Sequence, residues 1–200
     1  MTNVLLTGTK QAGKTTVCQR VAELARPQGY RPRGVLTPAL YDGNGAKIGF
    51  EALDLDSGRQ WLLALTEQGL DGPQIGPYTF DAAGLARAIE VLQRACALPG
   101  DLLIVDEIGP LELEHGQGFA PVLDLLPLPG PGHVLIVVRP ALLPALRRRL
   151  GGEFAIYTVT AGNRNLLPAY ITQELWPRRG NPQAQSSKLK QSSHSSSISV

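Results

Sequence analysis

The clearest chemical pattern lies near the start of the chain. The apolar stretch Val4–Leu6 leads into Gly8-Thr-Lys-Gln-Ala-Gly13-Lys14-Thr15, which matches the phosphate-binding pattern G-x-x-x-x-G-K-[ST] at every fixed position. The two glycines allow positive φ and a close approach of the backbone to phosphate oxygens. The N–H groups from about Gln11 to Thr16, together with the positive end of the following helix, would form a nest for a triphosphate. This loop therefore predicts nucleotide binding.

Two side chains of this loop have distinct predicted roles. Lys14 supplies a flexible charge that can follow the β- and γ-phosphates, so we predict that it is catalytic, and the Thr15 hydroxyl is placed to ligate Mg²⁺. The Mg²⁺ should keep several of its water ligands. The predicted nucleotide-binding residues of the loop are Gly8, Thr9, Lys10, Gln11, Ala12, Gly13, Lys14, Thr15 and Thr16.

A second pattern places two carboxylates after a buried strand. Leu102-Leu-Ile-Val105 is typical of a central parallel strand, and Asp106 and Glu107 follow it directly. Ligands of open α/β sheets bind at the carboxyl ends of strands, so we expect Asp106 to face the Mg²⁺ held by Thr15, as a Walker B aspartate does. Glu107 would then be free to deprotonate the water that attacks the γ-phosphorus. The alternative is that Glu107 is a solvated or helix-capping acid.

With these motifs the sequence resembles the small nucleoside-triphosphatases, a family that includes a thermophilic bacterial NTPase and the human cancer-related nucleoside-triphosphatase. The resemblance implies Mg²⁺-dependent hydrolysis of NTP to NDP and phosphate, with loose base specificity and slow turnover. It also implies that Glu107 is the general base and that Asn163 and Arg164 lie close to the nucleotide. The motifs that carry it, over about residues 3 to 171, are Thr7–Thr16, Gly34–Thr37, Ile48–Glu51, Ile75–Tyr78, Asp106–Gly109, Leu111–Leu113, Asn163–Asn165 and Leu167-Pro168.

The chain also departs from the family pattern. Pro110 stands where human-like members carry a lysine, and Pro38-Ala39 replaces an acidic pair. Any role of those family side chains cannot be carried over to this chain. The segment between Leu65 and Gly76 is poorly matched, so substrate contacts from it remain open.

The composition indicates one domain and a tail. Of the 200 residues, 43% are hydrophobic, which is enough to bury one large core, and we expect a nucleotide-binding domain at residues 1–176. Residues 177–200 contain eight serines, four basic residues and no acids, and are expected to be a disordered, Ser-rich basic tail. Without that tail there are 15 basic and 17 acidic residues. Charge therefore gives no argument for a nucleic-acid partner, although it does not exclude one.

The remaining composition favours a cytoplasmic protein. Cys18 and Cys96 have neither zinc-site nor C-x-x-C spacing, so buried, reduced thiols are expected. There is no charged leader with an apolar signal core and no stretch of about 18 apolar residues, so we expect neither secretion nor a membrane span. The predicted partners are nucleoside triphosphates (ATP, GTP, CTP and UTP), without an obligate protein partner.

Periodicity predicts an α/β fold. Strands are expected at about 4–6, 34–39, 47–55, 102–105, 133–138 and 154–159, and helices at about 15–25, 118–125, 140–150 and 163–175. A further helix should begin after Asp81 and present Leu85, Ile89, Leu92 and Cys96 on one face. Turns at 41–45 and 56–58 predict an antiparallel hairpin or a three-strand insertion. We therefore predict a three-layer, RecA-like P-loop NTPase fold with a mostly parallel sheet.

Two other functions remain open. A small P-loop kinase would need an acceptor pocket and an arginine-rich lid, for which candidate residues are few. A nucleotide-gated switch or adapter would fit Asp106-Glu-Ile-Gly109, which satisfies D-x-x-G, but the sequence has no guanine-reading N-K-x-D motif. Arg139 follows a predicted strand, and is either an arginine finger or an ordinary surface arginine.

Overall fold

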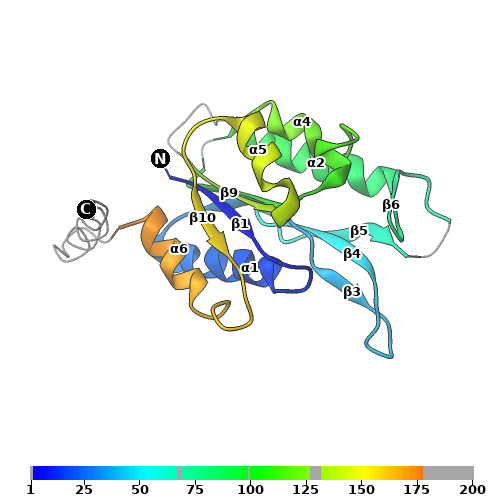
Figure 1. Cartoon of the computed structure of the whole chain (residues 1–200), viewed down its shortest axis with the longest axis horizontal. Coiled ribbons are helices and arrows are strands. Elements are labelled where there is room, and N and C mark those ends of the chain that lie inside the picture. The colour runs from blue at the N-terminus through cyan, green and yellow to red at the C-terminus, as the bar shows by residue number, and fades with distance from the viewer. Residues whose placement is uncertain (1, 67–68, 99, 127–131, 178–200) are drawn as a thin grey trace, which may run out of the picture.

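The protein forms one mixed β-sheet with helices on both faces, as seen in a computed structural model that describes residues 2–66, 69–98, 100–126 and 132–177 (Figure 1). The predicted tail, apart from Pro177, lies outside the described residues. The strands are β1 (Asn3–Thr7), β2 (Pro32–Leu36), β3 (Ala39–Tyr41), β4 (Lys47–Asp54), β5 (Gln60–Leu65), β6 (Gln74–Ile75), β7 (Tyr78–Phe80), β8 (Leu102–Ile108), β9 (His133–Val138) and β10 (Ala155–Thr158).

The sheet has a parallel half and an antiparallel half. Its order is β10-β1-β9-β8-β2-β4-β5-β7-β6, with β3 paired to β4. The first five of these strands run parallel, and every pairing from β2·β4 onward is antiparallel. The carboxyl ends of β10, β1, β9, β8 and β2 consequently meet at one edge.

The helices cover the two faces in separate groups (Figure 1). Helices α1 and α6 pack on one face, and α2, α4 and α5 pack on the other. Their bounds are α1 (Lys14–Ala25), α2 (Ala82–Ala97), α3 (Pro110–Leu113), α4 (Ala120–Leu123), α5 (Leu143–Leu150) and α6 (Leu167–Leu175), with short 3₁₀ helices η1 (Arg26–Gln28) and η2 (Pro140–Leu142).

Alternation along the central strands explains this layering. Leu103 and Val105 of β8 belong to the core under α2, whereas Ile104 belongs to the core under α1 and α6. Each central strand is therefore buried on both faces, which is why its sequence is an unbroken apolar run. The α/β prediction is confirmed. Cys18 and Cys96 are buried and free, as predicted.

Several predicted boundaries were wrong. The strand expected at 34–39 is two strands, because β2 ends before Thr37-Pro38, where the Thr37 N–H donates to Asp106 instead of continuing a ladder. The antiparallel insertion is larger than predicted, since β5, β6 and β7 extend the hairpin of β3 and β4. The helix expected at 118–125 is the four-residue α4, and Pro110–Leu113 forms an additional helix.

The last helix was also placed too early. We expected it to start at Asn163, but α6 begins at Leu167. The Asn163 side chain holds a loop instead: its Oδ1 accepts from the Thr160 N–H at 2.8 Å, and its Nδ2 donates to the Thr158 carbonyl at 2.9 Å. Asparagine side chains that bond nearby backbone groups favour such turns over helix interiors. In contrast, the cap predicted at Asp81 is confirmed, because its side chain accepts from the Gly84 N–H at 2.5 Å.

Candidate functional site

The predicted P-loop joins β1 to α1 at the carboxyl edge of the parallel strands. Gly8 and Gly13 have φ of 145° and 100°, and Gln11 has φ of 64°. Gly8 cannot be replaced without a shift, because an added Cβ would lie 2.6 Å from the Val159 carbonyl oxygen. Gly13 is the N-cap of α1 and has no side chain to cap the first N–H groups, which stay available to an anion.

Lys14 is folded back over its own loop. The side chain is largely buried, and Nζ donates to the carbonyl oxygens of Gly8 and Thr9, each at 3.2 Å. The same Nζ lies 3.6 Å from Oε2 of Glu107. The lysine thus connects the P-loop with the second predicted motif.

Asp106 and Glu107 lie in β8, two strands away from β1 in the sheet order. Asp106 is 1% exposed, and its Oδ2 accepts from the Thr37 N–H at 3.1 Å. Burial raises the pKa of Asp106 to about 6, against the effects of hydrogen bonds from the Thr37 N–H and the Thr15 hydroxyl and of the Lys14 charge. Thr15 and Asp106, the two predicted metal ligands, are therefore near enough for the hydroxyl to act on the pKa of the carboxyl.

These two groups fit a magnesium ion. A divalent cation would stabilise the charged form of a carboxylate whose pKa burial has raised. Among the described residues no group of three or more His, Cys, Asp or Glu side chains could hold a metal. A hydroxyl and one carboxylate suit Mg²⁺, which is usually held by one or two protein ligands together with substrate phosphates and water.

Glu107 is held between two cations. Its Oε1 accepts from Nε of Arg139 at 2.7 Å, and its Oε2 faces Lys14. Arg139 follows β9, the strand between β1 and β8. The glutamate side chain keeps 24% of its surface exposed, so water can reach it. The Glu107 side chain is therefore neither fully solvated nor a helix cap.

The remaining predicted residues lie beside the P-loop. Arg164 approaches Gly13, since a Cβ added there would lie 3.4 Å from Arg164 Cδ. Asn163 does not point free into the site, because both ends of its amide are bonded to the backbone after β10. Asn163 thus fixes the segment that carries Arg164.

The comparison that decides the family is a sequence match over most of the chain. The model of a family described as NTPase matches residues 3–172. The chain belongs to this NTPase family. The resemblance inferred from the motifs is thereby confirmed, and the family places the chain among the enzymes that hydrolyse nucleoside triphosphates.

Relatives of this NTPase include proteins named nucleoside-triphosphatase THEP1. One from Thermofilum pendens is 34% identical over 179 residues, which cover 86% of this chain and 94% of the relative. One from Methanopyrus kandleri is 43% identical over 112 residues, which cover 56% of this chain and 60% of the relative. The solution structure of a human cancer-related nucleoside triphosphatase superposes with a TM-score of 0.69 at 28% identity, covering 90% of this chain and 100% of that one.

Two further residues near the predicted site, Thr37 and Glu112, had no role assigned to them from the sequence. Thr37 contacts Asp106 through its backbone, which no side-chain pattern reveals. Glu112 is buried in α3, where Oε2 accepts from the Gly109 N–H at 2.7 Å and Oε1 from the Phe119 N–H at 3.1 Å. It anchors the turn that follows Asp106-Glu107. The only sequence signal for Thr37 and Glu112 was their place in the family motifs Gly34–Thr37 and Leu111–Leu113, to which no role was attached.

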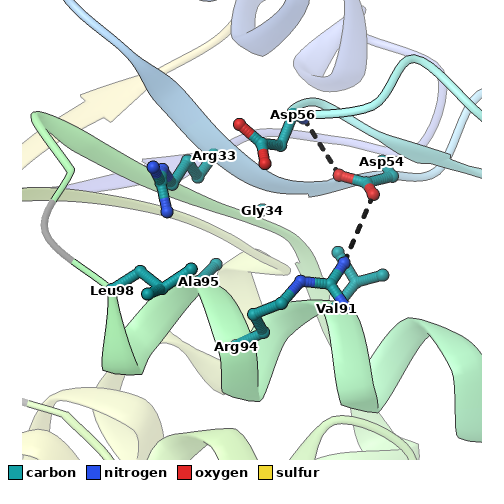
Figure 2. Close-up of a pocket in the computed structure, with 8 residues that line it drawn as sticks. All are labelled: Arg33, Gly34, Asp54, Asp56, Val91, Arg94, Ala95 and Leu98. Atoms are coloured by element: carbon teal, nitrogen blue, oxygen red, sulfur yellow. Dashed lines mark hydrogen bonds and ion pairs between the residues drawn. The ribbon is translucent and has the colours of Figure 1, made fainter.

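Two hollows lie away from the P-loop. One, of about 10 Å³, has room for about one water and is bounded by β2, the end of β4 and α2 (Figure 2). There Asp54 accepts from the Asp56 N–H at 2.9 Å and pairs with Arg94 at 3.6 Å. The other, of about 370 Å³, lies beside α3, α4 and α5. Neither is lined by P-loop residues, so neither is assigned to the nucleotide.

Proposed function

We propose that the chain is a Mg²⁺-dependent nucleoside-triphosphatase that converts NTP and water to NDP and phosphate. The observation that carries the proposal is the convergence of Lys14, Thr15, Asp106 and Glu107 at one edge of the sheet. Glu107 would take a proton from the attacking water while the bond between the γ-phosphorus and the β,γ-bridging oxygen breaks. Bound at Thr15 and Asp106, Mg²⁺ would neutralise charge on the phosphates.

The P-loop residues have separate tasks in this proposal. Backbone N–H groups of residues 11–16 would hold the phosphates, and Lys14 would exchange its bonds to Gly8 and Thr9 for phosphate oxygens. That exchange would move the lysine away from Glu107 and leave the carboxylate to Arg139 and the water. Arg164 would approach the nucleotide from the loop that Asn163 fixes.

We further propose loose base specificity, with ATP, GTP, CTP and UTP all as substrates. Support comes from the absence of an N-K-x-D motif from the sequence and from the family resemblance. We also propose that residues 1–176 form the hydrolase domain, because they contain every described helix and strand. The two free, buried thiols favour a cytoplasmic location. No helix among the described segments is long and apolar enough to cross a membrane.

The test is steady-state phosphate release from the four NTPs, for the wild type and for Glu107→Gln. We expect similar turnover of all four, complete dependence on Mg²⁺, and a loss of at least tenfold in kcat for Glu107→Gln with nucleotide still bound. Glu90→Gln is the matched control, because Glu90 is an exposed residue of α2. Phosphate transfer that requires an added acceptor would favour a kinase, and binding without turnover would favour a switch.

A further inference from the structure

Two lysines and two aromatic rings form a cluster between the P-loop and the antiparallel half of the sheet. Nζ of Lys47, the first residue of β4, lies 3.7 Å from the ring centroid of Phe50 and 5.7 Å from that of Tyr78. Nζ of Lys10, in the P-loop, lies 5.8 Å from the same Tyr78 ring. The two rings pack at 4.7 Å and 54°. Figure 1 shows the β3–β4 hairpin beside the loop that joins β1 to α1.

The position of Lys47 is fixed from two sides. Before it, Asp42 closes the hairpin turn: Oδ1 accepts from the N–H groups of Asn44 at 2.9 Å and Ala46 at 2.8 Å. After it, Phe50 supports the ammonium group through a cation–π contact, and Phe50 is itself paired with Ala39 of β3. A lysine held in this way loses less side-chain entropy on binding an anion than a free one.

Two cations and two carboxylates act on Lys47, but within the described part of the chain no carboxylate lies within ion-pair distance of it. Among the described residues it makes neither an ion pair within 4 Å nor a side-chain hydrogen bond. Burial and the neighbouring Lys10 lower the pKa of Lys47, Glu107 and Asp106 oppose them, and Arg139 has a smaller lowering effect. An anion bound between Lys47 and Lys10 would relieve the repulsion between these two lysines.

The position of that anion follows from the groups that act on Lys47. Lys10 lies in the loop that would hold the phosphates, and Lys47 is near enough to Asp106, Glu107 and Arg139 for their charges to act on its pKa. Arg139 already donates to Glu107, so it is committed to the proposed base. Lys47 is a cation at this mouth that no carboxylate holds among the described residues.

We propose that Lys47, supported by Phe50, is a phosphate-binding residue that contacts the terminal phosphate of the bound NTP. The inference rests on the proposed hydrolase function and adds a residue to it. The antiparallel hairpin thereby supplies in cis the cation that many phosphoryl-transfer enzymes supply as an arginine finger. Because the charge on the transferring phosphate spreads over its oxygens in the transition state, Lys47 acts in both binding and turnover.

The test compares Lys47→Met, Lys47→Arg and the wild type. We expect Lys47→Met to weaken binding of a non-hydrolysable NTP analogue about tenfold and to lower kcat about tenfold, while NDP affinity stays within twofold. Lys47→Arg should recover most of the analogue affinity and most of kcat, because it keeps the positive charge. Arg87→Met is the matched control, since it removes a cation that lies 5.4 Å from the ring of Trp61 on an exposed part of α2.

Three results would overturn the inference. The first is an unchanged preference for the NTP analogue over NDP in Lys47→Met. The second is an equal loss of NDP and NTP-analogue binding, which would indicate a structural role and should appear with a lower melting temperature. The third is unchanged hydrolysis with loss of inhibition by inorganic phosphate, which would assign Lys47 to the phosphate of a second molecule. If the wild type hydrolysed no NTP, the proposed function would fail, but the binding comparison would still decide the role of Lys47.

Discussion

Arg139 Nε donates to Glu107 Oε1 at 2.7 Å, and this contact joins the ends of two neighbouring parallel strands. Glu107 also faces Lys14, which would leave it when phosphates arrive. Arg139 would then be the group that continues to orient the proposed base. We therefore propose that Arg139 orients Glu107, a role that differs from both an arginine finger on the phosphate and an uninvolved surface residue.

Arg139→Ala should lower kcat about tenfold and change KM less than twofold, because it removes orientation of Glu107 and no contact to the nucleotide. Arg139→Lys should recover part of the loss. Since half of the Arg139 side chain is exposed, the stability of the protein should change by less than about 1 kcal/mol. Steady-state kinetics and thermal unfolding measure the two effects, with the exposed Arg148→Ala as control. An increase in kcat would instead show that Arg139 restrains the base.

Asn163 and Arg164 are adjacent, but the structure predicts different effects for their removal. Asn163→Ala deletes two side-chain bonds that close the loop after β10, so it should destabilise the protein by about 1–2 kcal/mol. Arg164→Ala should leave stability within about 0.5 kcal/mol, because the residue is exposed, but should weaken NTP binding several-fold.

The double variant separates the two roles. If Asn163 acts on the nucleotide by placing Arg164, Asn163→Ala should weaken NTP binding in the wild type and have little further effect once Arg164 is alanine. Nucleotide titrations of the four proteins measure this coupling. Fully additive losses of affinity would show that Asn163 contacts the nucleotide independently.

The local motifs could be predicted from the sequence because each one is continuous. The P-loop, the strand ending at Asp106-Glu107 and the Asp81 cap depend on residues within a few positions of one another. The sequence also predicted that Asp106 would face a metal ion held by Thr15, since the carboxyl ends of parallel strands share one edge. Sequence patterns of this kind predict a functional group when the residues that form it are close together along the chain.

Contacts between distant segments could not be predicted in the same way. The role of Lys47 depends on Phe50, on Tyr78 and on the P-loop, which the register of the antiparallel strands brings together. The irregular alternation of residues in β4 coincides with a register shift between Phe50 and Glu51. Periodicity therefore could not predict on which face of the sheet these side chains lie. Arg139 and Glu107 are 32 positions apart, and only the strand order makes them neighbours.

Asp106 should destabilise the nucleotide-free protein at neutral pH, because it is 1% exposed and its pKa is raised from 3.8 to about 6. A raised folded-state pKa in an acid means that folding favours the protonated form, so the cost is present in full above pH 6 and disappears as the pH falls toward 4. Asp106→Asn should therefore raise stability at pH 8 without Mg²⁺, by up to about 3 kcal/mol, and this advantage should shrink between pH 6 and pH 4.

Thermal unfolding across this pH range, in EDTA, measures the effect. Asp124→Asn is the control, because the Asp124 side chain is 66% exposed and its removal should produce no such pH-dependent gain. Adding Mg²⁺ with a non-hydrolysable NTP analogue should reverse the order, since the wild type gains ligand stabilisation that Asp106→Asn loses. If Asp106→Asn were less stable than the wild type at pH 8 in EDTA, the prediction would be wrong. That result would show that contacts within the fold stabilise the charged Asp106 carboxylate enough to offset its burial.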